Sequence, residues 1–183
     1  MEKQNIYQDI SARTGGEIYL GVVGPVRSGK STFIKRFMEL LVLPEIKDEN
    51  ERKRTMDELP QSGTGKMVMT TEPKFIPKEA AELPMEDMKI KIRLIDCVGF
   101  MIPGAGGNLE NGQERLVKTP WFDYEVPFTK AAEFGTRKVI RDHSTIGILV
   151  TADGSFGEIP RDSYVEAEKK TVEELNEIGK PFL

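Results

Sequence analysis

Cysteine and histidine are nearly absent from this chain. Its 183 residues include one cysteine, Cys97, and one histidine, His143. A disulfide within the chain and a zinc site built from histidine and cysteine are both excluded, because each needs more of these residues. The chain also lacks any run approaching the ~18 apolar residues that span a bilayer, and its polar start, MEKQN, is unlike a secretion signal. We therefore expect a soluble protein of the reducing cytoplasm.

An excess of basic charge is lacking too. The chain has 26 basic and 30 acidic residues and a net charge of −4, which gives no electrostatic reason to expect nucleic acid or anionic lipid as a partner. Its length suits one domain rather than two. We predict an N-terminal arm at 1–16 and a single domain at 17–183 that contains an inserted loop at 101–128. The last residues, 181–183, have the character of an opening strand, so the domain is expected to be truncated at its C-terminal end.

A glycine-rich loop follows the apolar run at 18–23. It reads GPVRSGKS and matches the phosphate-binding motif G-x-x-x-x-G-K-S, with a predicted strand before it and a predicted helix after it, as the motif requires. Its glycines let backbone N–H groups face a phosphate, and the helix adds the positive end of its dipole. A plain strand-to-helix turn would leave Lys30 unexplained. The predicted nucleotide-binding residues are Gly24, Pro25, Val26, Arg27, Ser28, Gly29, Lys30, Ser31, Thr32 and Gly99.

Apolar spacing gives the order of strands and helices. We predict a strand at 17–23, a helix from Lys30 to Pro44 that buries Phe33, Ile34, Phe37, Met38 and Leu41, and a solvated, mobile connection at 45–66. A strand at 89–96 pairs antiparallel with 74–76 across a turn region at 77–88. A helix at 129–144, a strand at 146–150 and a helix at 161–179 follow. The fold class is therefore α/β: a P-loop NTPase with a mainly parallel sheet, one antiparallel edge strand, and helices on both faces.

Two segments beyond the loop add residues suited to a nucleotide and its metal. Asp96-Cys97-Val98-Gly99 ends an apolar strand, where an aspartate can hold Mg²⁺ and a glycine N–H can face the γ-phosphate. Lys30 is expected to bridge the β- and γ-phosphates, and the Ser31 hydroxyl to ligate Mg²⁺. Thr70 and Thr71 precede the edge strand, where a threonine can close on the metal and the γ-phosphate. We favour Thr71, although both residues also suit the start of a strand.

With these motifs the chain resembles the translation-factor-related class of P-loop NTPases, and more closely the ATPase domains of the stage IV sporulation protein A family. The resemblance covers nearly the whole chain. The stretches that carry it are IYLGVVGPVRSGKSTFIK (18–35), TTEPKF (70–75), IRLIDCVGF (92–100), GTRKVIRDHSTIG (135–147) and IGKPF (178–182).

The resemblance implies an ATPase that uses ATP and Mg²⁺. It implies catalytic roles for Lys30, Thr70 and Thr71, and metal ligation by Ser31, Thr71 and Asp96. It further implies self-assembly into filaments as the base of the spore coat, in the mother-cell cytoplasm at the outer forespore membrane. The implied partners are other copies of the chain and, through regions outside it, further coat morphogenetic proteins and a small membrane-bound amphipathic peptide. The choice of ATP over GTP depends on the resemblance alone.

Two positions depart from small GTPases. Phe100 stands where many of those enzymes have a glutamine that orients water, and a phenylalanine side chain neither donates nor accepts a hydrogen bond. Arg27 stands where some cation-dependent relatives have an asparagine that ligates potassium. We hypothesise that its guanidinium replaces that ion as a catalytic group, although a surface ion pair is also open. Two other functions also stay open: a GTP-hydrolysing switch, and a structural protein that uses nucleotide only as a folding ligand.

Overall fold

The computed structural model describes residues 15–60, 71–85 and 88–183. Most of the predicted arm at 1–16, the end of the predicted connection at 45–66 and Thr70 therefore lie outside the described residues. None of the helices in the described ranges is both long and apolar enough to cross a membrane.

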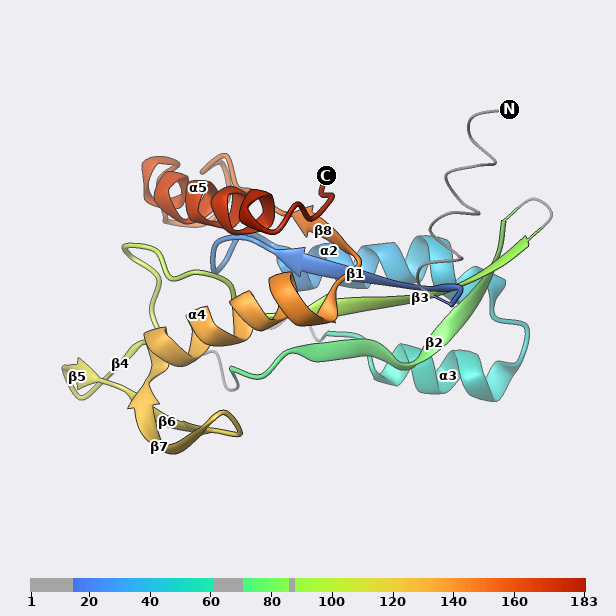
Figure 1. Cartoon of the computed structure of the whole chain (residues 1–183), viewed down its shortest axis with the longest axis horizontal. Coiled ribbons are helices and arrows are strands. Elements are labelled where there is room, and N and C mark those ends of the chain that lie inside the picture. The colour runs from blue at the N-terminus through green and yellow to red at the C-terminus, as the bar shows by residue number, and fades with distance from the viewer. Residues whose placement is uncertain (1–14, 61–70, 86–87) are drawn as a thin grey trace.

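A four-stranded sheet forms the centre of the domain, in the order β2-β3-β1-β8 (Figure 1). The strands are β1 (Glu17–Val23), β2 (Lys74–Met85), β3 (Met88–Asp96) and β8 (Ile146–Leu149). β1 pairs in parallel with both β3 and β8, whereas β2 pairs antiparallel with β3 at the edge. The mainly parallel sheet with one antiparallel edge strand is confirmed.

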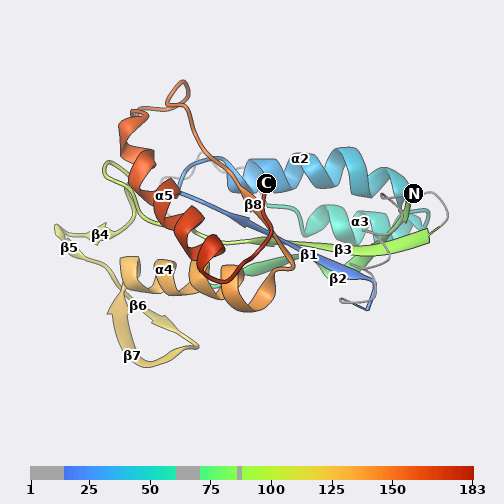
Figure 2. The ribbon, with the colours of Figure 1, turned by 45° about the horizontal axis from the view of Figure 1, so that its top comes forward.

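Helices cover both faces of this sheet. Neighbouring residues of a strand point to opposite faces, and both Leu94 and Ile95 of β3 are fully buried. Leu94 packs in a core with α2 (Lys30–Phe37), whereas Ile95 packs in a second core with η3 (Val139–His143) and α5 (Asp162–Glu177). Figure 2 shows α5 together with α4 (Phe128–Lys138), with α2 on the other side of the sheet. The predicted helices on both faces are therefore confirmed.

The segment after the glycine-rich loop differs from the prediction in two ways. The helix continues after α2 as a π-helical turn, η1 (Met38–Val42), and a short 3₁₀ turn, η2 (Leu43–Glu45). The wider turn buries Val42 and leaves Leu41 55% exposed, so the expected burial of Leu41 is wrong. The solvated connection is also wrong over part of its length, because it contains α3 (Glu49–Asp57), which Asp48 caps by accepting a hydrogen bond from the Glu51 N–H.

The predicted turn and inserted loop contain more regular structure than expected. β2 continues through the prolines at 77 and 84, with a register shift between Ile76 and Ala81, so it occupies most of the predicted turn region. The prolines are tolerated because β2 is an edge strand. The insertion contains two hairpins, one of β4 (Leu109–Glu110) with β5 (Gln113–Glu114), and one of β6 (Leu116–Thr119) with β7 (Phe122–Pro127). The last residues extend the sheet as expected, since Phe182 bridges in parallel to Gly147 of β8.

Candidate functional site

The loop at 24–31 joins β1 to α2 at the carboxyl edge of the sheet. Its backbone takes positive φ at Gly24 (130°), Arg27 (60°) and Gly29 (95°), which lets the chain curl tightly before α2 begins. The Val26 N–H donates to the Phe100 carbonyl at 2.8 Å, and the Phe100 N–H donates to the Gly24 carbonyl at 3.2 Å. The loop is thus fixed against the segment that follows β3.

Lys30, the first residue of α2, is buried, with its side chain turned back onto the loop. It is only 4% exposed, and its Nζ donates to the Pro25 carbonyl at 2.5 Å. Burial lowers the pKa of Lys30, while the nearby Cys97 and Asp96 act in the opposite direction. A partly compensated ammonium at a helix N-terminus is well suited to an anionic ligand.

Asp96 and Ser31 meet beside Lys30. The Ser31 hydroxyl donates to Asp96 Oδ2 at 2.7 Å, whereas Oδ1 of the same carboxylate is buried without a hydrogen-bond partner among the described residues. Burial raises the pKa of Asp96, against the opposing effects of Ser31 and Lys30. Carboxylate and hydroxyl oxygens are ligands that Mg²⁺ prefers, and a metal-bound water would satisfy Oδ1. These residues therefore fit a Mg²⁺ ion.

Gly99 comes into close contact with the loop. Its φ is +96°, and a Cβ on it would lie 2.2 Å from the Gly24 carbonyl oxygen and 2.6 Å from Lys30 Nζ. No residue with a side chain fits there without movement of the loop backbone. The Gly99 N–H donates to Thr136 Oγ1 of α4 at 3.2 Å, so the predicted γ-phosphate donor already has a partner, which sequence reasoning missed.

The threonine candidates are only partly described. Thr70 lies outside the described residues. Thr71 is buried, and its carbonyl oxygen lies over Gly135 of α4, where a Cβ on that glycine would come within 2.6 Å. Assignment of a metal-ligating threonine stays a prediction.

The remaining loop side chains differ in accessibility. Ser28 is buried, and its hydroxyl has no hydrogen-bond partner within the described part of the chain. Thr32 is exposed on α2. Arg27 is exposed as well, and its charge acts against the burial that raises the pKa of Tyr164 in α5. The catalytic role of Arg27 stays a prediction.

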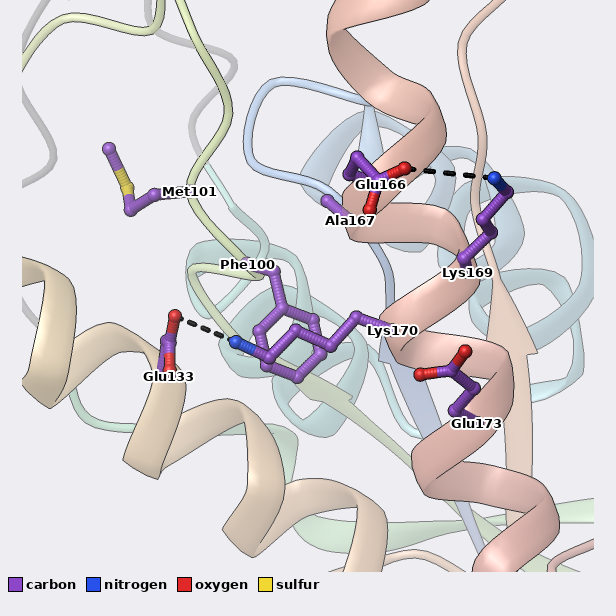
Figure 3. Close-up of a pocket in the computed structure, with 8 residues that line it drawn as sticks. All are labelled: Phe100, Met101, Glu133, Glu166, Ala167, Lys169, Lys170 and Glu173. Carbon is purple, nitrogen blue, oxygen red and sulfur yellow. Dashed lines mark hydrogen bonds and ion pairs between the residues drawn. The ribbon is translucent and has the colours of Figure 1, made fainter.

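Phe100 is buried under two cations. The Lys170 Nζ lies 4.8 Å from the centre of its ring, and the Arg137 guanidinium carbon lies 6.0 Å from it. Lys170 also pairs with Glu133 at 2.9 Å across α5 and α4, beside a cavity of about 670 Å³ (Figure 3). A packed phenyl ring does not orient water, so the departure from small GTPases holds in the structure.

A mainly parallel sheet covered by helices, with a buried lysine and a carboxylate–hydroxyl pair at its carboxyl edge, defines a mixed α/β domain with a polar site suited to an anion and a metal. The chain belongs to the stage IV sporulation protein A ATPase-domain family, whose family model matches residues 1–183.

Relatives named stage IV sporulation protein A are similar over nearly the whole chain. The chain is 55% identical to the one from Bacillus anthracis and 56% identical to the one from Bacillus subtilis (strain 168), and both matches cover all of this chain. It is 56% identical to the one from Clostridioides difficile (strain 630) over 97% of its length. The chain spans about 37% of the first two relatives and 36% of the third.

Proposed function

We propose that this domain is a P-loop nucleoside triphosphatase that binds ATP with Mg²⁺ at the 24–31 loop and hydrolyses it. The observation that carries the proposal is the meeting of Lys30 and Ser31 with Asp96 and Gly99, two pairs of residues from segments far apart in the sequence. Two buried oxygens without partners in the described structure, Asp96 Oδ1 and Ser28 Oγ, are consistent with a ligand there. The name of the family, which includes ATPase, supports the choice of reaction.

Each residue has a role that follows from its position. The Lys30 ammonium leaves the Pro25 carbonyl and pairs with the β- and γ-phosphates, which compensates its charge better than one neutral carbonyl does. Ser31 and Asp96 hold the metal through the hydroxyl and the carboxylate. When bound, Mg²⁺ neutralises charge that develops on the phosphates.

The residues around this centre complete the proposal. Backbone N–H groups of the 24–32 stretch, together with that of Gly99, bind the phosphates, except at Pro25, which has no N–H, and at Val26, whose N–H donates to the Phe100 carbonyl. Thr71, with Thr70 as the alternative, closes on the metal and the γ-phosphate. Arg27 supplies positive charge as the γ-phosphate leaves, since Phe100 offers no group that could orient water.

The domain is further proposed to use ATP turnover in sporulation. Occupancy of the γ-phosphate site alters the 60–71 and 100–128 segments and so controls self-assembly into a filamentous basal layer of the spore coat. That layer lies in the mother-cell cytoplasm at the forespore surface. Coat proteins and an amphipathic membrane peptide are further proposed partners, through regions outside these 183 residues.

Turnover of ATP and GTP by this chain, with and without Mg²⁺, tests the enzymatic claim. We expect Mg²⁺-dependent ATP hydrolysis that falls in a Thr71→Ala variant. A preference for GTP would favour the switch alternative. Nucleotide binding without turnover by any form of the protein would contradict an enzyme.

Lys30→Ala distinguishes the ATPase from a structural protein that uses nucleotide as a folding ligand. Because Lys30 is a buried cation with one neutral partner, its removal should leave the nucleotide-free fold intact. Loss of turnover and of assembly with unchanged melting supports the ATPase. Loss of the fold would instead support the structural alternative.

A further inference from the structure

Thr136 of α4 is buried beside the candidate site, and no expected role accounts for it. Its side chain is fully buried, at 0% exposure. Its Oγ1 donates to the Ala132 carbonyl at 2.8 Å and accepts from the Gly99 N–H at 3.2 Å. The hydroxyl therefore links α4 to the backbone group that the proposed function assigns to the γ-phosphate.

The preceding residue of α4 contacts the other segment proposed to sense the γ-phosphate. A Cβ on Gly135 would lie 2.6 Å from the Thr71 carbonyl oxygen and 3.0 Å from the Trp121 ring. Trp121 also packs on Phe134 at a ring-centre distance of 5.2 Å. Two adjacent helix residues thus contact both sensing segments, and the β6–β7 hairpin lies against the same part of α4.

We propose that Thr136 is a positioning residue that competes with the γ-phosphate for the Gly99 N–H. In the described structure Thr136 accepts that hydrogen bond. When a triphosphate is bound, the N–H donates to the phosphate and Thr136 keeps its bond to the Ala132 carbonyl. The competition makes the site distinguish ATP from ADP, and it transmits the difference to α4 and to the hairpin. This inference rests on the proposed function, because it needs a γ-phosphate beside Gly99.

The proposal predicts the direction in which loss of the Thr136 hydroxyl changes the affinity for ATP. A Thr136→Val variant has the same shape but no hydroxyl, so in the nucleotide-free and ADP-bound protein the Gly99 N–H loses its oxygen acceptor and keeps only the Cys97 sulfur, which is a weak acceptor. A triphosphate then supplies the missing acceptor. The variant should therefore bind a non-hydrolysable ATP analogue about five- to tenfold more tightly than the unmodified chain does, with ADP affinity unchanged.

The test is a pair of Kd measurements by calorimetry, for ADP and for a non-hydrolysable ATP analogue, each with Mg²⁺. Thr136→Ser keeps the hydroxyl and is the matched control, with the ratio of the two Kd values expected to stay as in the unmodified chain. Trp121, the one tryptophan in the sequence, gives an independent readout. Its fluorescence should respond to the ATP analogue and not to ADP.

Equal changes for both nucleotides, or weaker binding of the ATP analogue by Thr136→Val, would overturn the inference and leave the proposed function standing. If the unmodified chain bound neither nucleotide, the proposed function would fail and the inference with it. Should Thr136→Val not fold, the Gly99 amide signal of the unmodified chain decides by NMR. A shift with the ATP analogue alone supports the competition, and an identical signal with both nucleotides refutes it.

Discussion

Replacing Gly99 with alanine should destabilise the nucleotide-free domain more than a comparable replacement elsewhere in the same site. The new Cβ would lie 2.2 Å from the Gly24 carbonyl oxygen and 3.0 Å from the Pro25 carbonyl carbon. Both atoms belong to the backbone, so no change of rotamer relieves the contact. The residue would also be held at a φ of +96°, which L-residues other than glycine rarely adopt.

Gly29 separates these two effects. Its φ is +95°, almost the same, but a Cβ on it would have no atom within 4 Å. Gly29→Ala therefore carries the backbone strain alone, about 1–2 kcal/mol. Gly99→Ala adds an overpacking cost of typically 1–3 kcal/mol, and we expect the upper part of that range because the neighbours are backbone atoms. The two variants should differ by about 2–3 kcal/mol.

Chemical denaturation of the two variants without nucleotide gives the comparison directly. For a domain of this size the expected difference corresponds to ~4–12 °C in Tm. Gly106→Ala, at a glycine with open space around it, should change the free energy of unfolding by less than about 0.5 kcal/mol. If Gly99→Ala and Gly29→Ala lost the same stability, the close contact between Gly99 and the 24–31 loop would be refuted.

Three further predictions concern other parts of the domain. Without nucleotide, Asp96→Asn should unfold with a free energy within about 1 kcal/mol of the original or higher, because burial opposes the charged carboxylate. The same variant should lose Mg²⁺-dependent ATP binding. A large loss of stability in urea would contradict this prediction. Glu174→Gln should cost about 1–3 kcal/mol of unfolding free energy, because it removes the charge that accepts hydrogen bonds from Arg137 and Arg141. Burial alone would raise the pKa of Glu174, but these hydrogen bonds outweigh it and lower the pKa. The stabilisation is therefore present above about pH 4.5 and is lost as the pH falls through the lowered pKa, so the melting temperatures of the two proteins should converge in acid. Asp48→Ala should cost about 1 kcal/mol through loss of the α3 cap, and an unchanged denaturation midpoint would show that α3 contributes little to folding.

Each part of the site that sequence reasoning predicted lies within one short segment of the chain. The loop at 24–31 has a strand before it and a helix after it, and Asp96 ends β3, as the alternating pattern indicated. Such features depend on local spacing, which a single sequence displays. The mainly parallel pairing of the sheet follows from the same alternation of strands and helices, whereas the order of its strands was not predicted.

The misses have two physical origins. In one case a local signal was present but was not used, because Asp48 followed three residues later by Glu51 is a helix-capping pattern. In the other case no local signal exists: a single π-helical turn moved Leu41 to the surface. The bond between Gly99 and Thr136 likewise joins residues 37 positions apart, so neither segment reveals it alone.

Binding of a non-hydrolysable ATP analogue with Mg²⁺, measured by calorimetry on the chain and on Lys30→Ala, tests the central claim most directly. We predict one site on the unmodified chain and a loss of about ten- to hundredfold in affinity in the variant, with unchanged melting of the nucleotide-free proteins. Equal affinity of the two proteins would place the nucleotide elsewhere, and no binding by the unmodified chain would contradict the account.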